Sequence, residues 1–209
     1  ASGPVAVFSG VDCSNTSFPD GTLAACDRLE QQMFPLETWG QGGAKTAADL
    51  WREVAAGETT LRDDPALREV RVAQVFIRRG GRVLMEIEQE MTDGRRRVRD
   101  WPPSEKFKLG EDARTAAQRC LCEELGLDVR PVALCEDGRP YIRKTDSPSY
   151  PGLLTVYRVY TIALDAAVLP AAGLPDNDFW RDNSAANDPI RRHLWGWREE
   201  RDPLLGARG

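Results

Sequence analysis

Apolar and polar residues change their period along this chain, and the first clear pattern is helical. After Thr46, whose hydroxyl can cap a helix, apolar residues recur at Leu50, Trp51 and Val54. This spacing places them on one side of a helix. We therefore predict a helix from Thr46 through Ala56.

From Val70 onward the pattern changes to alternation, which is typical of half-buried strands. Gly-Gly and Asp-Gly pairs between alternating runs are typical of hairpin turns. The predicted strands are Val70–Arg78, Arg82–Gln89, Arg95–Trp101, Val129–Glu136, Leu153–Leu164 and Leu194–Trp197, with turns at Gly80-Gly81 and Asp93-Gly94. Residues 165–187 are predicted to form a loop and Pro189–His193 a short helix.

A second helix is predicted between the two groups of strands. Asp112 can cap it, good helix formers fill Ala113–Leu125, and Gly126 can end it. Strands before and after a helix, with another helix packing on the sheet, predict an α/β fold: an α/β/α sandwich with a mixed sheet.

The first 43 residues differ from the rest because they are rich in Gly, Ser, Thr and Pro. We predict an extended N-terminal arm at residues 1–43, with a short helix at Leu23–Met33, and a domain at residues 44–209. The arm is expected to wrap a protein partner. Because the chain starts at Ala1 without methionine, we expect a mitochondrial or plastid protein after transit-peptide removal, or otherwise a cytoplasmic one.

Composition excludes several classes of function. The 209 residues are 41% hydrophobic and 29% charged, which is ordinary for a globular chain, and no apolar run is long enough for a membrane span. A net charge of −5 argues against a protein that coats nucleic acid. Five cysteines are too few for a disulfide scaffold, and Cys120-x-Cys122 lacks the second pair that a zinc site needs.

The second predicted helix gathers acidic residues at its end. Residues three and four apart share a helical face, so Cys120, Glu123 and Glu124 lie on one side. Carboxylates on one face suit a hard cation such as Mg²⁺ or Mn²⁺, which binds diphosphate oxygens. The alternative is the solvated acidic end of an amphipathic helix. We expect this face, including position 120, to be open to water.

The segment Glu105–Leu127, called the box segment below, resembles the Nudix box, G-x5-E-x7-R-E-U-x-E-E-x-G-U, where U is a bulky aliphatic residue. The matching residues are Glu111, Arg119, Leu121, Glu123, Glu124, Gly126 and Leu127. Two positions depart, because Glu105 replaces the opening glycine and Cys120 replaces a glutamate. The resemblance implies metal ligands at Glu111, Glu123 and Glu124, and catalytic roles for Glu123, Glu124 and Arg119.

Two alternative functions can be predicted, because Cys120 replaces a glutamate of the pattern. A thiol has an ordinary pKa of ~8.5 and is a poor ligand for Mg²⁺, so metal binding should be weak. One prediction is a catalytically impaired Nudix-like protein that binds a nucleotide or RNA, or serves as a structural subunit of a larger assembly. The alternative is an active Mg²⁺-dependent hydrolase of nucleoside diphosphates linked to another moiety, with Glu123 and Glu124 as ligands, Glu111 in support and Arg119 organising the carboxylates. Separately, the carboxylate of Glu105 could reach the site and replace the one that is lost at Cys120.

Basic residues beside the box segment are candidates for phosphate binding. We predict that Arg97, Arg99 and Lys106 hold phosphate, because guanidinium forks suit polyphosphates. Strand alternation would place Arg95, Arg97 and Arg99 on one face, and Arg96 with Val98 on the other. Alternatively, these are exposed charges paired with Asp93 and Asp100. His193, the single histidine, is predicted to lie at the surface because arginines precede it.

Overall fold

A computed structural model describes residues 38–41, 44–63, 66–130, 132–136, 138–147, 149–169, 174–184 and 189–200. The predicted arm at residues 1–43, with its helix at Leu23–Met33, lies outside the described residues except for 38–41. The chain forms two compact units, one of Ala1–Glu69 with Lys144–Val156 and one of Val70–Arg143 with Tyr157–Gly209.

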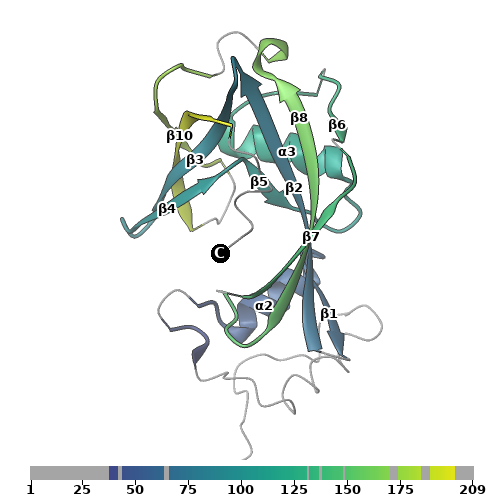
Figure 1. Ribbon diagram of the computed structural model, residues 1–209. Helices are drawn as coiled ribbons and strands as arrows, with labels where there is room; N and C mark the ends of the chain where they lie inside the picture. The colour runs from purple at the N-terminus through teal and green to yellow at the C-terminus, as the bar shows by residue number, and fades with distance from the viewer. Residues whose placement is uncertain are drawn as a thin grey trace, which may run out of the picture. The chain divides into compact units, whose positions relative to one another are not determined.

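The described residues form a mixed sheet with few helices (Figure 1). Its main strand order is β6-β8-β2-β3-β10-β9, with β1 and β5 beside β2, β4 beside β3, and β7 beside β8. The arrows of β2 and β8 point the same way in Figure 1, whereas β3 runs antiparallel to β4 and β10. The elements are β1 (Thr60–Asp63), β2 (Ala66–Arg79), β3 (Arg82–Met91), β4 (Arg96–Trp101), β5 (Ser104–Lys106), β6 (Cys135–Glu136), β7 (Tyr141–Asp146), β8 (Leu154–Asp165), β9 (Phe179–Asp182), β10 (Ile190–Glu199), α2 (Ala47–Ala55), α3 (Ala113–Leu125) and the 3-10 helix η3 (Ala166–Val168). The predicted α/β class with a mixed sheet is confirmed.

In the first unit, α2 begins where its sequence signal predicts. The Thr46 hydroxyl accepts a hydrogen bond from the backbone N–H of Asp49. The Asp49 carboxylate accepts one from the backbone N–H of Thr46, so the two residues form a capping box. A small core of Trp39, Leu50, Tyr150 and Leu153 packs beside the helix. Local capping and one apolar stripe therefore define this helix.

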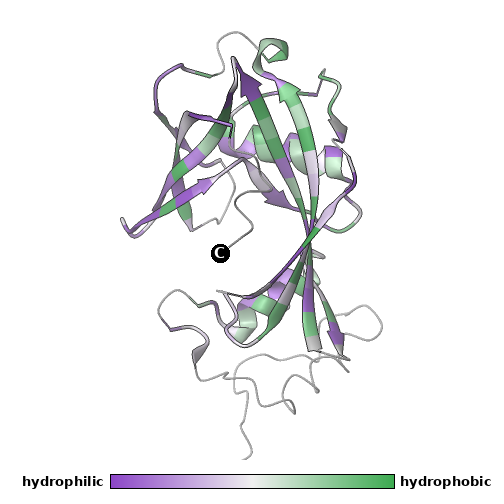
Figure 2. Ribbon diagram, in the orientation of Figure 1, coloured by the Kyte–Doolittle hydropathy of each residue, from purple (hydrophilic) through white to green (hydrophobic). Residues whose placement is uncertain are grey.

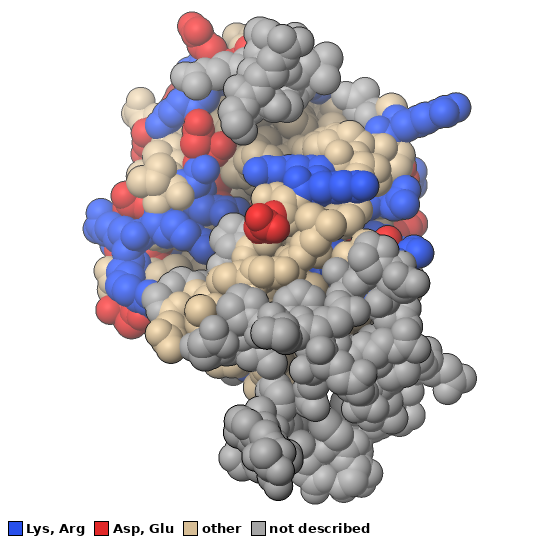
Figure 3. Space-filling model, turned by 60° about the horizontal axis from the view of Figure 1, so that its bottom comes forward, with Lys and Arg blue, Asp and Glu red and all other residues tan. Residues whose placement is uncertain are grey.

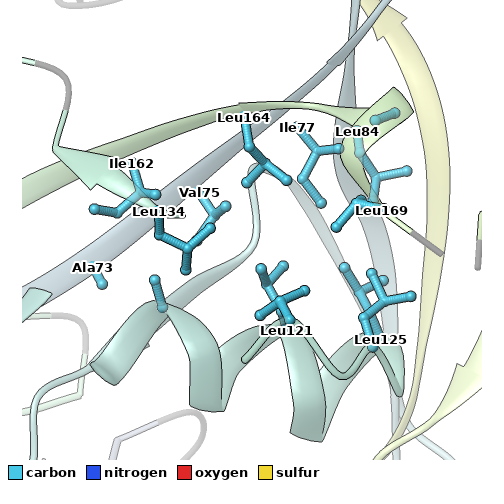
Figure 4. Close-up of a cluster of buried hydrophobic side chains, with 14 of the residues drawn as sticks. Ala73, Val75, Ile77, Leu84, Leu121, Leu125, Leu134, Ile162, Leu164 and Leu169 are labelled. Carbon is cyan, nitrogen blue, oxygen red and sulfur yellow. The ribbon is translucent and has the colours of Figure 1, made fainter. Parts of the chain in front are cut away.

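In the second unit, α3 packs its apolar side against the sheet. Asp112 caps it by accepting from the Thr115 backbone at 2.8 Å, and Gly126 ends it at φ 66°. Figure 4 shows Leu121 and Leu125 pointing from the helix toward the strands, and Figure 2 shows the apolar residues along both elements. The buried partners on the strands include Ala73, Val75, Ile77, Leu84, Ile162 and Leu164. No helix in the described part of the chain is long and apolar enough to cross a membrane.

The C-terminal part of the fold differs from the prediction. Pro189–His193 was predicted as a short helix, but Ile190 begins the long strand β10. The loop predicted at residues 165–187 contains β9, and the strand predicted at Val129–Glu136 is limited to Cys135–Glu136. Because β10 pairs with β3, its conformation depends on residues about one hundred positions away, which a local pattern does not contain.

Candidate functional site

Arg119 organises the box segment. Its guanidinium donates to both carboxylate oxygens of Glu111, at 2.9 and 3.0 Å, and to the backbone carbonyl of Lys106 at 2.6 Å. It also lies 3.4 Å from Glu123 and 3.3 Å from Glu105. The hydrogen bonds from Arg119 hold the pKa of Glu111 below its ordinary value. One cation therefore engages three carboxylates of the segment.

Glu105, at the position of the expected glycine, directs its carboxyl group into the same cluster. One oxygen accepts from the Lys106 backbone at 2.9 Å, and the other faces Arg119. Burial raises the pKa of Glu105, and the charge of Arg119 offsets this only in part. The residue is therefore a member of the site and not a surface substitution.

Cys120 corrects one prediction from the sequence. This face was expected to be open to water at position 120, but the Cys120 side chain is fully buried. Burial raises its pKa well above the ordinary value, and the charges of Glu124 and Glu105 add to the effect. A buried neutral thiol neither activates water nor binds Mg²⁺ well.

The surroundings of Glu124 disfavour the ionised form of its carboxyl group. Burial raises its pKa well above the ordinary value, and the nearby charges of Glu86 and Glu105 raise it further. Glu86 comes from β3, so the sheet contributes an acid that pattern analysis of the box segment missed. The absence of a recognisable motif around Glu86 explains why sequence reasoning did not find it.

His193 is buried, and the prediction that it lies at the surface is wrong. Its side chain is 1% exposed, Nδ1 lies 2.5 Å from Glu86 Oε1, and its ring stacks on Trp195. Arg99 donates to the other oxygen of Glu86 at 3.1 Å. Burial opposes the charge of Glu86, but the bond to His193 and the charge of Arg99 lower its pKa overall.

The predicted phosphate-binding residues occupy two places. Arg97 donates to Gln89 and Arg99 to Glu86, so both arginines share the sheet face that carries His193. Lys106 lies in β5, where its carbonyl contacts Arg119. Arg96 instead contacts Glu88 and Glu90, as the predicted alternation of faces requires.

The described residues do not present a preformed metal centre. Among them, no group of three or more His, Cys, Asp or Glu side chains is close enough to hold a metal ion. Arg119 holds Glu111 and contacts Glu123, while the thiol at position 120 is buried. The donor set in this arrangement therefore does not fit Mg²⁺, which requires several oxygen ligands.

Comparison with known proteins gives distant similarities. A sequence profile described as IgGFc binding protein matches residues 1–61, and no curated protein matches the chain. A NUDIX hydrolase from Nitrosomonas europaea is 15% identical, with 66% of this chain and 84% of that chain covered and a TM-score of 0.38. A MutT NUDIX hydrolase from Burkholderia pseudomallei is 19% identical, with 65% and 88% covered and a TM-score of 0.37. The E. coli dihydroneopterin triphosphate pyrophosphohydrolase is 17% identical, with 63% and 80% covered and a TM-score of 0.36.

The raised pKa of Glu124 predicts a pH-dependent stability. Folding favours the protonated acid, so stability falls as pH rises above its ordinary value of 4.5 toward the raised value. Glu124→Gln should therefore raise the melting temperature at about pH 7 and change it little at about pH 4. Thermal unfolding monitored by circular dichroism measures both, with the exposed Glu136→Gln as a control. An equal shift at both pH values would contradict the prediction.

Proposed function

We propose that this chain is a Nudix-like protein with impaired hydrolytic activity, which binds the phosphates of a nucleotide or nucleic acid within a larger assembly. One observation carries the proposal: Arg119 contacts Glu105, Glu111 and Glu123 together, while Cys120 is fully buried. Acids held by an internal cation offer little free charge to Mg²⁺ or Mn²⁺. Metal binding should therefore be weak.

Phosphate binding is supported by the sheet face beside the box segment. Gln89 orients Arg97, and Glu86 orients Arg99, so both guanidinium groups are held before any ligand arrives. Oriented guanidinium groups lose little side-chain freedom on binding phosphate oxygens. The charge of Glu86 acts on Glu124, which places this face close to the box segment.

Glu105 favours the alternative of an active hydrolase. Its carboxyl group enters the cluster and lies 3.3 Å from Arg119, where it can replace the oxygen that is lost at position 120. In that case Glu123 and Glu124 act with Glu105 on a diphosphate, and Arg119 positions them. Weak metal binding without hydrolysis of the diphosphate is expected from the first proposal and not from this one.

Binding and turnover of nucleotides test the proposal together. ADP should bind in a calorimeter, and Arg97→Gln or Arg99→Gln should weaken its binding by about tenfold. Arg130→Gln is the control, because Arg130 is exposed and pairs with Asp128. Melting curves verify that each variant is folded.

A panel of nucleoside diphosphates linked to sugars, incubated with Mg²⁺ or Mn²⁺, should show hydrolysis far below ~1 s⁻¹. Turnover at or above that rate would establish the active hydrolase. If both arginine variants bound ADP as tightly as the native chain, the proposed phosphate site would be contradicted.

A further inference from the structure

Glu86, on β3, is the residue at which an arginine of the proposed phosphate site and a buried histidine meet. Its Oε2 accepts from Arg99 Nε at 3.1 Å, and its Oε1 lies 2.5 Å from His193 Nδ1. Burial opposes the charge of Glu86, but its bond to His193 and the charge of Arg99 lower its pKa overall. A hydrogen bond from the Gln89 side chain acts in the same direction. Three neighbouring side chains are therefore held by one carboxylate.

Gln89 extends this set of contacts to the second arginine of the site. Its side-chain oxygen accepts from Arg97 Nε at 3.0 Å and also from Arg97 Nη2, so its amide N–H groups are left to donate to Glu86. In the register of the sheet, Gln89 lies opposite Arg97 on β4 and opposite His193 on β10. The two arginines and His193 therefore belong to one hydrogen-bond network across three strands, with Glu86 at its centre.

The members of this network differ in their exposure to water. Glu86, Gln89 and His193 are 5%, 4% and 1% exposed. Arg97, in contrast, is exposed, and the Arg99 side chain is 34% exposed. In Figure 3 Lys and Arg gather on the side of the molecule that carries β4 in Figure 1. The two guanidinium groups can thus meet a ligand, whereas the residues that hold them are buried.

His193 contributes a hydrogen bond that packing alone would not require. Its ring stacks on Trp195, with 5.7 Å between the ring centroids. Because an ionised carboxylate only accepts hydrogen bonds, Nδ1 donates to Glu86. The other ring nitrogen, Nε2, is buried and has no hydrogen-bond partner among the described residues. A buried nitrogen without a partner is unfavourable, so an apolar ring would suit the packing better, and the bond to Glu86 explains the histidine.

We propose that His193 is a positioning residue of the phosphate site, because it fixes Glu86 and thereby orients both guanidinium groups for the phosphates of a nucleotide. This inference rests on the proposed function and adds to it the residue that sets the geometry of the site. His193 itself stays beneath the surface and does not touch the ligand. Without its N–H, the Glu86 carboxylate loses a donor that fixes its rotamer. Both arginines then have more side-chain freedom to lose on binding, which weakens the affinity.

Two substitutions at position 193 separate the hydrogen bond from the packing of the ring. His193→Asn keeps an N–H donor near the place of Nδ1 but has no ring, whereas His193→Phe keeps a ring that can stack on Trp195 but has no donor. In calorimetric titrations of the full chain with ADP, His193→Asn should bind within about threefold of the native chain. His193→Phe should bind about tenfold more weakly. A residue with only a packing role would give the opposite order.

Trp197→Phe is the matched control, since it removes a different hydrogen bond from an aromatic ring of the same strand, the one from Trp197 Nε1 to the Pro175 carbonyl. It should bind ADP within about threefold of the native chain. In the Arg99→Gln chain, His193→Phe should weaken ADP binding less than it does in the native chain, because one of the groups that it disturbs is already absent. Melting curves verify that each variant is folded, and His193→Leu, which also lacks the donor, replaces His193→Phe if that variant does not fold.

A second measurement needs no ligand. The Arg99 Nε–H donates to Glu86, so its exchange with water, followed by NMR of ¹⁵N-labelled chain, reports how firmly this carboxylate holds it. Exchange should be faster in His193→Phe than in the native chain, and close to native in His193→Asn and Trp197→Phe.

Three results would overturn the proposal while leaving the phosphate site in place. The first is equal ADP binding by the native chain and a folded variant that lacks the donor. The second is a loss of ADP binding in Trp197→Phe that equals the loss in His193→Phe. The third is exchange of the Arg99 Nε–H at the same rate in His193→Phe and the native chain. Failure of the native chain to bind ADP is a different result, because it would contradict the proposed function and, with it, the role of His193 in phosphate binding.

Discussion

Arg119→Ala should lower the free energy of unfolding by about 3 kcal/mol, because it leaves partly buried carboxylates without their cation. Arg119 is 15% exposed, and its partners Glu105, Glu111 and Glu123 are 13–26% exposed, so water screens these contacts poorly. The substitution also removes the donor to the Lys106 carbonyl. Urea denaturation measures the loss.

Two variants separate this effect from a change in helix propensity. Arg114 lies on the exposed side of the same helix, so Arg114→Ala should change the free energy of unfolding by no more than about 0.5 kcal/mol. Arg119→Lys keeps the charge but not the forked contact with Glu111, so its loss should be intermediate. Equal stability of the native chain and Arg119→Ala would show that the carboxylates do not depend on this cation.

Cys120→Glu should destabilise the fold by several kcal/mol at neutral pH, because it places a carboxylate at a fully buried position. Glu124 and Glu105 lie near enough to raise the pKa of the native thiol, and they would repel the new charge. The loss should shrink as pH falls, since protonation removes the added charge. Denaturation curves across acid to neutral pH test this expectation.

Cys122→Glu is the matched control, since Cys122 is exposed and lies on the same helix. Its stability should stay within about 0.5 kcal/mol of the native chain. Cys120→Ala distinguishes loss of the thiol from the cost of the new charge, and it should be much less destabilising than Cys120→Glu. A Cys120→Glu variant as stable as the native chain would mean that position 120 is reached by water.

The sequence contains enough information for elements with local determinants. The cap at Asp112 and the left-handed glycine at Gly126 define α3, and Thr46 defines the start of α2 in the same way. Strands β9 and β10 are different, because β9 depends on pairing with β10, and β10 depends in turn on pairing with the distant strand β3. Local polarity around Pro189 therefore predicted a helix where pairing produces a strand.

The candidate site likewise contains some residues that are close in sequence and others that only tertiary packing brings together. The structure brings Glu111, Arg119 and Glu123 of the box segment into one cluster, and their loop and helix are continuous in sequence. The pairing of His193 with Glu86 joins residues 107 positions apart, so neighbouring arginines were a poor guide to its burial. The burial of Cys120 depends likewise on tertiary packing, which helical periodicity alone does not define.

Calorimetric titration of the native chain with Mg²⁺, without nucleotide, tests the central claim most directly. The account predicts a dissociation constant in the millimolar range, because Arg119 engages the acids of the box segment and the thiol of Cys120 supplies no oxygen. Glu105→Gln should leave this weak binding nearly unchanged. Micromolar Mg²⁺ binding that Glu105→Gln abolishes would contradict the account and establish Glu105 as the replacement ligand.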